Sequence, residues 1–353
     1  MNKNLRIALS TAGVAAACYL FYNVLSTFDW SAVGIILSSL APWKLVVLLL
    51  PFFLEVIFDC LGWRHLLPTE FRQISIWKIF RARTGPEAIV MTVPMGPFIS
   101  EPLKAWILFK ITGLKTSIGM ASVLLRSCFL VLAQCTVVIL TTILGFNWIN
   151  GISNQVIGSA GLSVLILASA GLLLAVYAGS LMIASRSSMI KRLHNLLKHA
   201  KFVWVRKVWA SSENYFTELN EQFQTFGNER RSTLGAAFLI YLLPWIFQCI
   251  ETFVILSLLG SDISILHAFA IEAACGFLRS VAFMVPSGLG VQDSAYYLML
   301  SAAEVSHPLA AAFILIKRSR EVLWIGLGYG MLLFSGFSLK TSMRATQTNI
   351  SAE

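Results

Sequence analysis

Apolar runs long enough to cross a lipid bilayer dominate this chain. Apolar residues make up 57% of its 353 residues, and Asp, Glu, Lys and Arg only 12%, against roughly a quarter charged residues in soluble domains. About 20 helical residues cross the hydrocarbon core of a membrane. The sequence therefore predicts an all-α, polytopic membrane helix bundle of about six to eight membrane segments, forming one integral membrane domain over residues 1–353.

The first run, from Ile7 to Leu25, follows Lys3 and Arg6 and lacks a small-x-small cleavage site. We therefore expect a retained first helix rather than a signal peptide. Residues 29–40 resemble a short interfacial helix. The apolar runs place helices over 5–25, 42–62, 117–146, 156–184, 233–259, 263–285 and 308–338.

The distribution of Lys and Arg predicts the orientation. They concentrate at both ends of the chain and within 64–83, 104–115 and 186–231, whereas the loops near 147–155 and 260–264 contain none. Cytoplasmic loops carry the excess of basic residues, so we expect both termini in the cytoplasm. The net charge of +10 then reports topology and not a nucleic-acid partner.

The hydrophilic stretch 186–231 mixes Trp204 and Trp209 with Lys and Arg. Such a pattern is typical of a basic amphipathic helix on the anionic cytoplasmic leaflet. A solvated loop with some helix is the alternative. In either case the stretch is too short to form a separate catalytic domain.

A short motif occurs twice. Val93-Pro-Met-Gly96 and Val285-Pro-Ser-Gly288 contain the only two Pro-x-Gly sequences of the chain, and a carboxylate follows each, at Glu101 and Asp293. Proline removes a helical hydrogen bond and glycine admits unusual backbone angles. Interrupted apolar segments at matching places in two halves indicate a transporter binding site. The residues expected to break the helices are Pro94, Gly96, Pro286, Gly288 and Gly290.

The two copies differ in their flanks. Basic sequence surrounds the first, while Asp262, Glu304 and His307 surround the second. We therefore expect the segments 85–108 and 286–303 to enter from opposite faces as an inverted pair of re-entrant segments. An ordinary pair of kinked helices is the alternative.

Charged residues inside the apolar segments are the candidate functional groups, because each costs about 2.5–3.5 kcal/mol at mid-membrane even on lenient scales. Glu55 and Asp59 share a helix face and suit a proton relay, unless Asp59 reaches toward Arg64. The others are Arg126, Glu251, Glu272, Arg279, Lys317, Arg318, Arg320 and Glu321.

Arginine is well suited to bidentate phosphate contact. Arg279, Arg320 and Arg126 could therefore hold a lipid head group. Glu272 lies seven residues before Arg279 and could pair with it. The competing interpretation is a structural network with Glu251, Glu272 and Glu321. No motif for a nucleophile, a nucleotide or a metal stands out, and the Cys and His residues lack metal-ligand spacing, so we expect no catalytic residue, metal or cofactor.

The segment from Val285 to Ala295 resembles a signature of the flippase-like integral membrane family, which shares its membrane region with lysylphosphatidylglycerol synthases. The segment Gly96 to Lys104 resembles that family's other marked region. Gln292-Asp293 stands where Arg-Glu is usual, which weakens any role needing a positive charge there. The second motif is most similar to the bacterial branch associated with hopanoid biosynthesis.

The resemblance implies a lipid or lipid-linked-molecule translocase in a bacterial inner (plasma) membrane, with membrane lipids as substrate. The sequence ends at Glu353, soon after the last expected helix, so we expect no aminoacyl-transfer domain. A membrane-embedded enzyme or accessory subunit of a lipid pathway such as hopanoid biosynthesis is the alternative, and a scaffold a third possibility. No protein partner is predicted. The expected substrate-binding residues are Glu101, Lys104, Arg126, Glu272, Arg279, Asp293 and Arg320.

Overall fold

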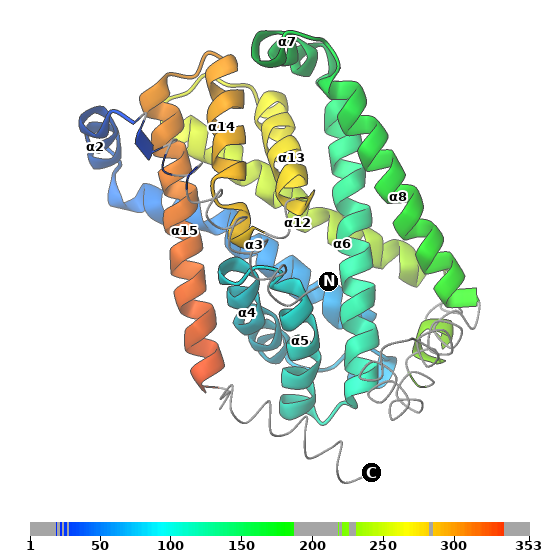
Figure 1. Cartoon of the computed structure of the whole chain (residues 1–353). Helices are drawn as coiled ribbons and strands as arrows, with labels where there is room; N and C mark the ends of the chain where they lie inside the picture. The colour runs from blue at the N-terminus through cyan, green and yellow to red at the C-terminus, as the bar shows by residue number, and fades with distance from the viewer. Residues whose placement is uncertain are drawn as a thin grey trace, which may run out of the picture.

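The computed structural model describes residues 28–186, 231–281 and 285–334, with a few positions before 28 and between 218 and 225. All regular structure in these residues is helical (Figure 1), which confirms the all-α prediction. The expected helix over 5–25, most of the basic stretch 186–231 and the C-terminal tail lie outside the described residues.

The helices follow the chain order labelled in Figure 1. Two 3-10 turns, η1 (Thr69–Phe71) and η2 (Pro286–Gly288), interrupt them. The α-helices are α2 (Trp30–Ser38), α3 (Pro42–Leu66), α4 (Ile76–Thr92), α5 (Pro97–Thr112), α6 (Thr116–Leu144), α7 (Phe146–Ile157), α8 (Leu162–Arg186), α12 (Arg231–Leu258), α13 (Ile265–Val281), α14 (Val291–Ala302) and α15 (His307–Phe334).

The chain is a multi-pass membrane protein. Within the described residues, four helical stretches are long and apolar enough to span a bilayer: Pro42–Leu66, Thr116–Leu144, Leu162–Ser180 and Ser232–Leu258. This is fewer than the six to eight segments expected. Helix α15 has 28 residues but carries four charged side chains in its middle, at Lys317, Arg318, Arg320 and Glu321.

Two pairs of short helices fill the space between the long ones. Helices α4 and α5 have 17 and 16 residues, and α13 and α14 have 17 and 12. At 1.5 Å per residue, α14 is about 18 Å long, well below the roughly 30 Å of hydrocarbon. In Figure 1, α4 and α5 lie in the lower half and α13 and α14 in the upper half. The turn η2, which follows α13, contacts α4.

The turns of these two pairs share an unusual backbone. Val93 and Val285 are extended, with φ/ψ of −113/131° and −94/120°. The following Met95 and Ser287 both adopt left-handed angles, with φ of 57° and 51°. The two Val-Pro-x-Gly motifs therefore begin with the same change of direction, which L-residues adopt at a cost.

Two stretches expected as loops are helical. The sequence 147–155 lies in α7, whose Ile149, Ile152 and Ser153 are buried while Phe146 and Gln155 are exposed. This one-sided pattern suits a short helix lying against the bundle. The end of 64–83 lies in α4, where Arg83 is buried. Its partner is Asp59, so this basic residue belongs to the core and not to a loop.

Candidate functional site

The charged residues of the apolar segments gather in the interior as two clusters. The first cluster is defined by Glu55, Asp59, Arg83, Glu87, Glu101, Lys104 and Arg126, from helices α3 to α6. The second cluster is defined by Glu251, Glu272, Arg279, Asp293, Lys317, Arg318, Arg320 and Glu321, from helices α12 to α15.

Asp59 is the centre of the first cluster. Its carboxylate accepts hydrogen bonds from Arg126 Nε at 2.8 Å and Nη2 at 2.5 Å, and from Arg83 Nε at 2.8 Å. All three side chains are at least 94% buried. Buried charges persist only when paired in this way. The alternative that Asp59 reaches toward Arg64 is therefore wrong.

Lys104 pairs with two further carboxylates of the first cluster. Its ammonium lies 2.8 Å from Glu101 and 3.1 Å from Glu87, and Ser127 Oγ lies 3.4 Å from the other oxygen of Glu101. Lys104 is 1% exposed. The acid and base expected to bind substrate on α5 are thus paired with each other.

Glu55 is the member of the first cluster that also faces the second cluster. It is 4.0 Å from Arg83, and the charges of Arg320 and Arg279 also act on it. The guanidinium carbon of Arg320 lies 3.9 Å from the centre of the Phe52 ring, and Phe52 precedes Glu55 by one turn of α3. Glu55 and Asp59 therefore differ sharply in environment, since two guanidinium groups neutralise only Asp59.

Glu251 and Glu272 anchor the second cluster. Lys317 Nζ lies 2.8 Å from Glu251 and 3.0 Å from Glu272, and Arg320 Nη1 lies 2.6 Å from both oxygens of Glu251. Glu272 also accepts hydrogen bonds from Tyr296 Oη at 2.6 Å and from Thr252. All three donors bind the same oxygen of Glu272, Oε2, and Arg279 is not among them.

Asp293 ties the α13–α14 turn to α15. It accepts two hydrogen bonds from Arg318, at 2.8 and 2.7 Å, and one from the Gly290 amide at 2.8 Å. Arg318 also contacts Glu321, whose carboxylate accepts a hydrogen bond from Ser287 Oγ at 3.0 Å. This bidentate pair fixes the position of the motif that follows Val285.

Arg279 differs from the other cations. It lines a small cavity of about 10 Å³, roughly the room that one water needs, together with Glu272, Gln292, Asp293 and Arg320. No hydrogen bond or ion pair joins its side chain to another residue in the described part of the chain. Arg126 instead belongs to the first cluster, so the structure does not gather Arg126, Arg279 and Arg320 into one site.

Several buried polar side-chain atoms of the two clusters lack a hydrogen bond within the described part of the chain. Glu55 Oε2, Glu272 Oε1 and Arg320 Nε have no hydrogen-bond partner among the residues that are described. Such atoms are costly in a dry interior and indicate contact with water or a polar ligand. Within the same residues, no group of three or more His, Cys, Asp and Glu is arranged to hold a metal ion.

Sequence reasoning missed two members of the first cluster. Arg83 ends the basic stretch 64–83, and Glu87 follows Gly85-Pro86, a pair typical of turns. Both lie inside α4. The sequence does carry one signal for Glu87. It directly precedes the apolar run that starts at Ala88, a position that places its carboxylate at the edge of an apolar segment.

The comparisons with known proteins agree with this membrane architecture. A search of curated proteins gives no significant match. A sequence profile described as the lysylphosphatidylglycerol synthase TM region matches residues 5–328, which is nearly the whole of the 353 residues. The chain therefore belongs to the family defined by the transmembrane region of lysylphosphatidylglycerol synthases.

Proposed function

We propose that this protein is a lipid translocase whose polar pathway runs between the two charged clusters. The observation that carries the proposal is the pair of short-helix hairpins, each with a Val-Pro-x-Gly turn beside buried charges. Charges inside a membrane segment are expensive and mark substrate or ion pathways. A polar head group could cross along these charges while its hydrocarbon chains remain in lipid.

We further propose that the two hairpins are re-entrant and form an inverted pair. The spacing between Val93 and Val285 also separates Glu101 from Asp293 and Arg126 from Arg318. The helix bounds show the same relation. When the first and last residues of α3, α4, α5 and α6 are shifted along the chain by this spacing, they fall within about three residues of the ends of α12, α13, α14 and α15. One spacing over four helices supports an internal duplication whose two copies face opposite sides.

The proposed substrate contacts are Arg279 and the nearby buried polar atoms that have no hydrogen-bond partner among the described residues. Arg279 is half-buried, lines the cavity of the second cluster and has a fork suited to a phosphate. Other charged residues of the two clusters would exchange their present ion pairs for contacts with the passing head group. They are Glu101, Lys104, Arg126, Glu272, Asp293 and Arg320. Glu55 is the proposed proton carrier, while Asp59 serves as its fixed anionic neighbour.

The orientation and location belong to the same proposal. The positive-inside rule supports cytoplasmic termini and a cytoplasmic stretch 186–231 against anionic lipid. The family match supports a bacterial inner membrane. A role in a hopanoid pathway rests on the motif after Val285 alone.

Purified protein in vesicles with a leaflet-sensitive fluorescent lipid tests the translocase. Arg279→Ala and Asp293→Ala should each reduce lipid movement at least tenfold while leaving membrane insertion intact. Lys78→Ala, an exposed cation at the start of α4, is the matched control and should keep full activity. Wild-type flux in both site variants would refute the proposal, and chemical change of the lipid without movement would favour the enzyme alternative.

A further inference from the structure

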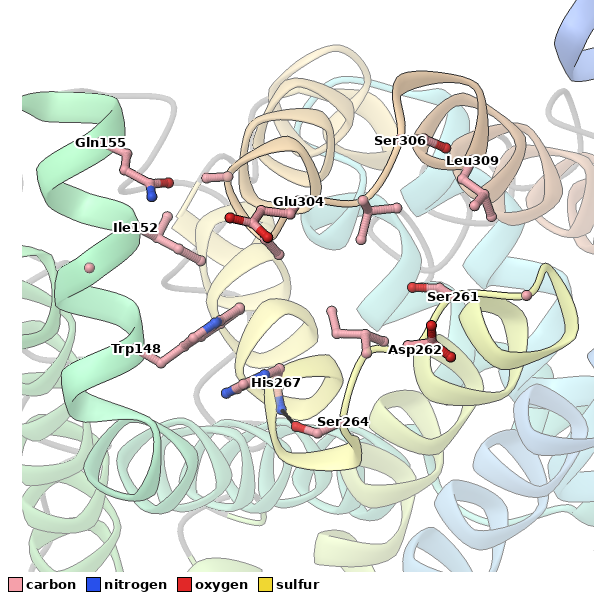
Figure 2. A pocket seen from close by; sticks show the side chains of 16 residues that line it. Trp148, Ile152, Gln155, Ser261, Asp262, Ser264, His267, Glu304, Ser306 and Leu309 are labelled. Carbon is pink, nitrogen blue, oxygen red and sulfur yellow. Dashed lines mark hydrogen bonds between the residues drawn. The ribbon is translucent and has the colours of Figure 1, made fainter.

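A polar chamber lies at the end of the molecule opposite the α5–α6 turn. It is bounded by α7, the α12–α13 loop and the α14–α15 loop, and has a volume of about 780 Å³. Figure 2 shows Trp148, Asp262, His267 and Glu304 around this common space. We call it the vestibule.

An apolar groove lies beside the vestibule. It has a volume of about 320 Å³ between α8, α13 and α14, at the lower end of the roughly 300–1,000 Å³ typical of ligand sites. Leu165 and Leu298 on its rim are 66% and 48% exposed, so the groove opens toward the bilayer. The side chains that line it are Ile152, Ser153, Leu162, Leu165, Ile166, Ser169, Ala274, Cys275, Phe277, Leu278, Ala295, Leu298 and Met299.

The two cavities share a wall. Ile152 of α7 lines both the vestibule and the groove. A polar chamber that adjoins an apolar, membrane-facing groove has the shape and polarity of an amphiphile. We propose that this is a lipid-binding site, with the head group in the vestibule and one hydrocarbon chain in the groove.

The charges of the vestibule select the head group. Among the residues that the structure describes, no Lys or Arg lines it, while Asp262 and Glu304 both do. Neither carboxylate makes a side-chain hydrogen bond or ion pair with any residue that the structure describes. Carboxylates accept hydrogen bonds from hydroxyl and amine donors and repel anions. The site therefore takes a lipid whose head group carries no net negative charge.

An aromatic platform adds to this preference. Trp148 and His267 stack at 4.2 Å with an angle of 9° between their rings, and both line the vestibule. The exposed face of such a pair offers an apolar surface to the glycerol region and a favourable face to an ammonium group.

The site also adjoins the helices that carry the second cluster. Ala274 and Phe277 of α13 and Ala295 and Met299 of α14 line the groove, while Glu272 and Asp293 of the same two helices belong to the second cluster. A role as the lipid's docking place on this face rests on the proposed function. Binding itself requires only that the protein sits in a membrane.

Photocrosslinking tests the binding site without any transport measurement. The probes are phosphatidylethanolamine and phosphatidylglycerol with the same diazirine-bearing chain, presented in vesicles and mapped by mass spectrometry. We expect labels on the groove helices α8, α13 and α14, and several-fold more label from the zwitterionic lipid. Asp262→Asn with Glu304→Gln should bring the two lipids toward equal labelling, whereas Glu70→Gln, at an exposed acid in η1, should not.

Two plug variants test the groove independently. Ala295→Trp fills it from α14 and Ser169→Phe from α8, and each should reduce labelling at least fivefold. Leu323→Trp, on the exposed face of α15, should leave it unchanged. Labelling that is spread over the lipid-facing surface, or that survives both plugs, would overturn the site. Groove labelling in a protein that moves no lipid would leave the site standing and refute only the translocase.

Discussion

At the scale of single residues, the first cluster depends on one carboxylate. Asp59 compensates both Arg83 and Arg126 in a fully buried place. Removing its charge leaves Arg126 without its paired anion and Arg83 with only Glu55 at 4.0 Å, and breaking a buried pair typically costs about 3–5 kcal/mol. We expect Asp59→Asn to lower the unfolding temperature and yield in detergent markedly, and Glu55→Gln to have a much smaller effect. Equal stability of the two variants would contradict the assigned pairing.

Glu218 offers a pH-dependent contact outside the membrane. Ser117 Oγ donates to it at 2.6 Å and Lys115 Nζ at 3.2 Å, and these bonds hold the pKa of Glu218 below its usual value. A lowered pKa in the folded state stabilises above the unfolded pKa, and this contribution is lost as the pH falls through the folded value.

Thermal unfolding of wild type and Glu218→Gln at two pH values measures that contribution. The wild type should be slightly more stable near pH 7, and the difference should vanish near pH 3. A difference that persists in acid would show that the carboxylate's charge is not the cause.

At the scale of elements, the turn of the first hairpin requires glycine for a steric reason. A Cβ at Gly96 would lie 2.5 Å from Val90 Cα and 2.7 Å from Ile89 O, both backbone atoms that cannot give way cheaply. Gly34 of α2 has no atom within 4 Å of such a Cβ.

Gly96→Ala should therefore destabilise the protein by about 1–3 kcal/mol, while Gly34→Ala should be neutral or slightly stabilising. Denaturation in mixed micelles compares the two. A neutral Gly96→Ala would mean that α4 and α5 separate easily at this turn.

At the scale of the whole molecule, the re-entrant arrangement predicts sidedness. The first hairpin should begin and end on one face of the membrane, and the second on the other. Membrane-impermeant thiol reagents should label Gln73→Cys and Lys115→Cys from one side, and Asp262→Cys and Ser306→Cys from the opposite side. All four positions are exposed. If the two flanks of either hairpin are labelled from different sides, that hairpin spans the membrane.

The sequence also predicted much at this scale. The apolar runs located α3, α6, α12 and α15 to within a few residues, since run length and helix rise are local properties. The motifs at Val93 and Val285 located both turns for the same reason. Helix α7 was not predicted, because Asn147, Asn150 and Asn154 interrupt its apolar positions, which gain a partner only when α8 and α14 pack against them.

By itself, then, the sequence determined that this chain is a helical membrane protein of its family, broken at two matching places. Only the tertiary structure decided which charges meet. Asp59 forms ion pairs with Arg83 and Arg126 rather than with Arg64. Glu272 forms an ion pair with Lys317 rather than with Arg279. Ion pairs form between helices distant in the sequence, so their choice depends on how the helices cross. Helix periodicity and composition carry no record of that crossing.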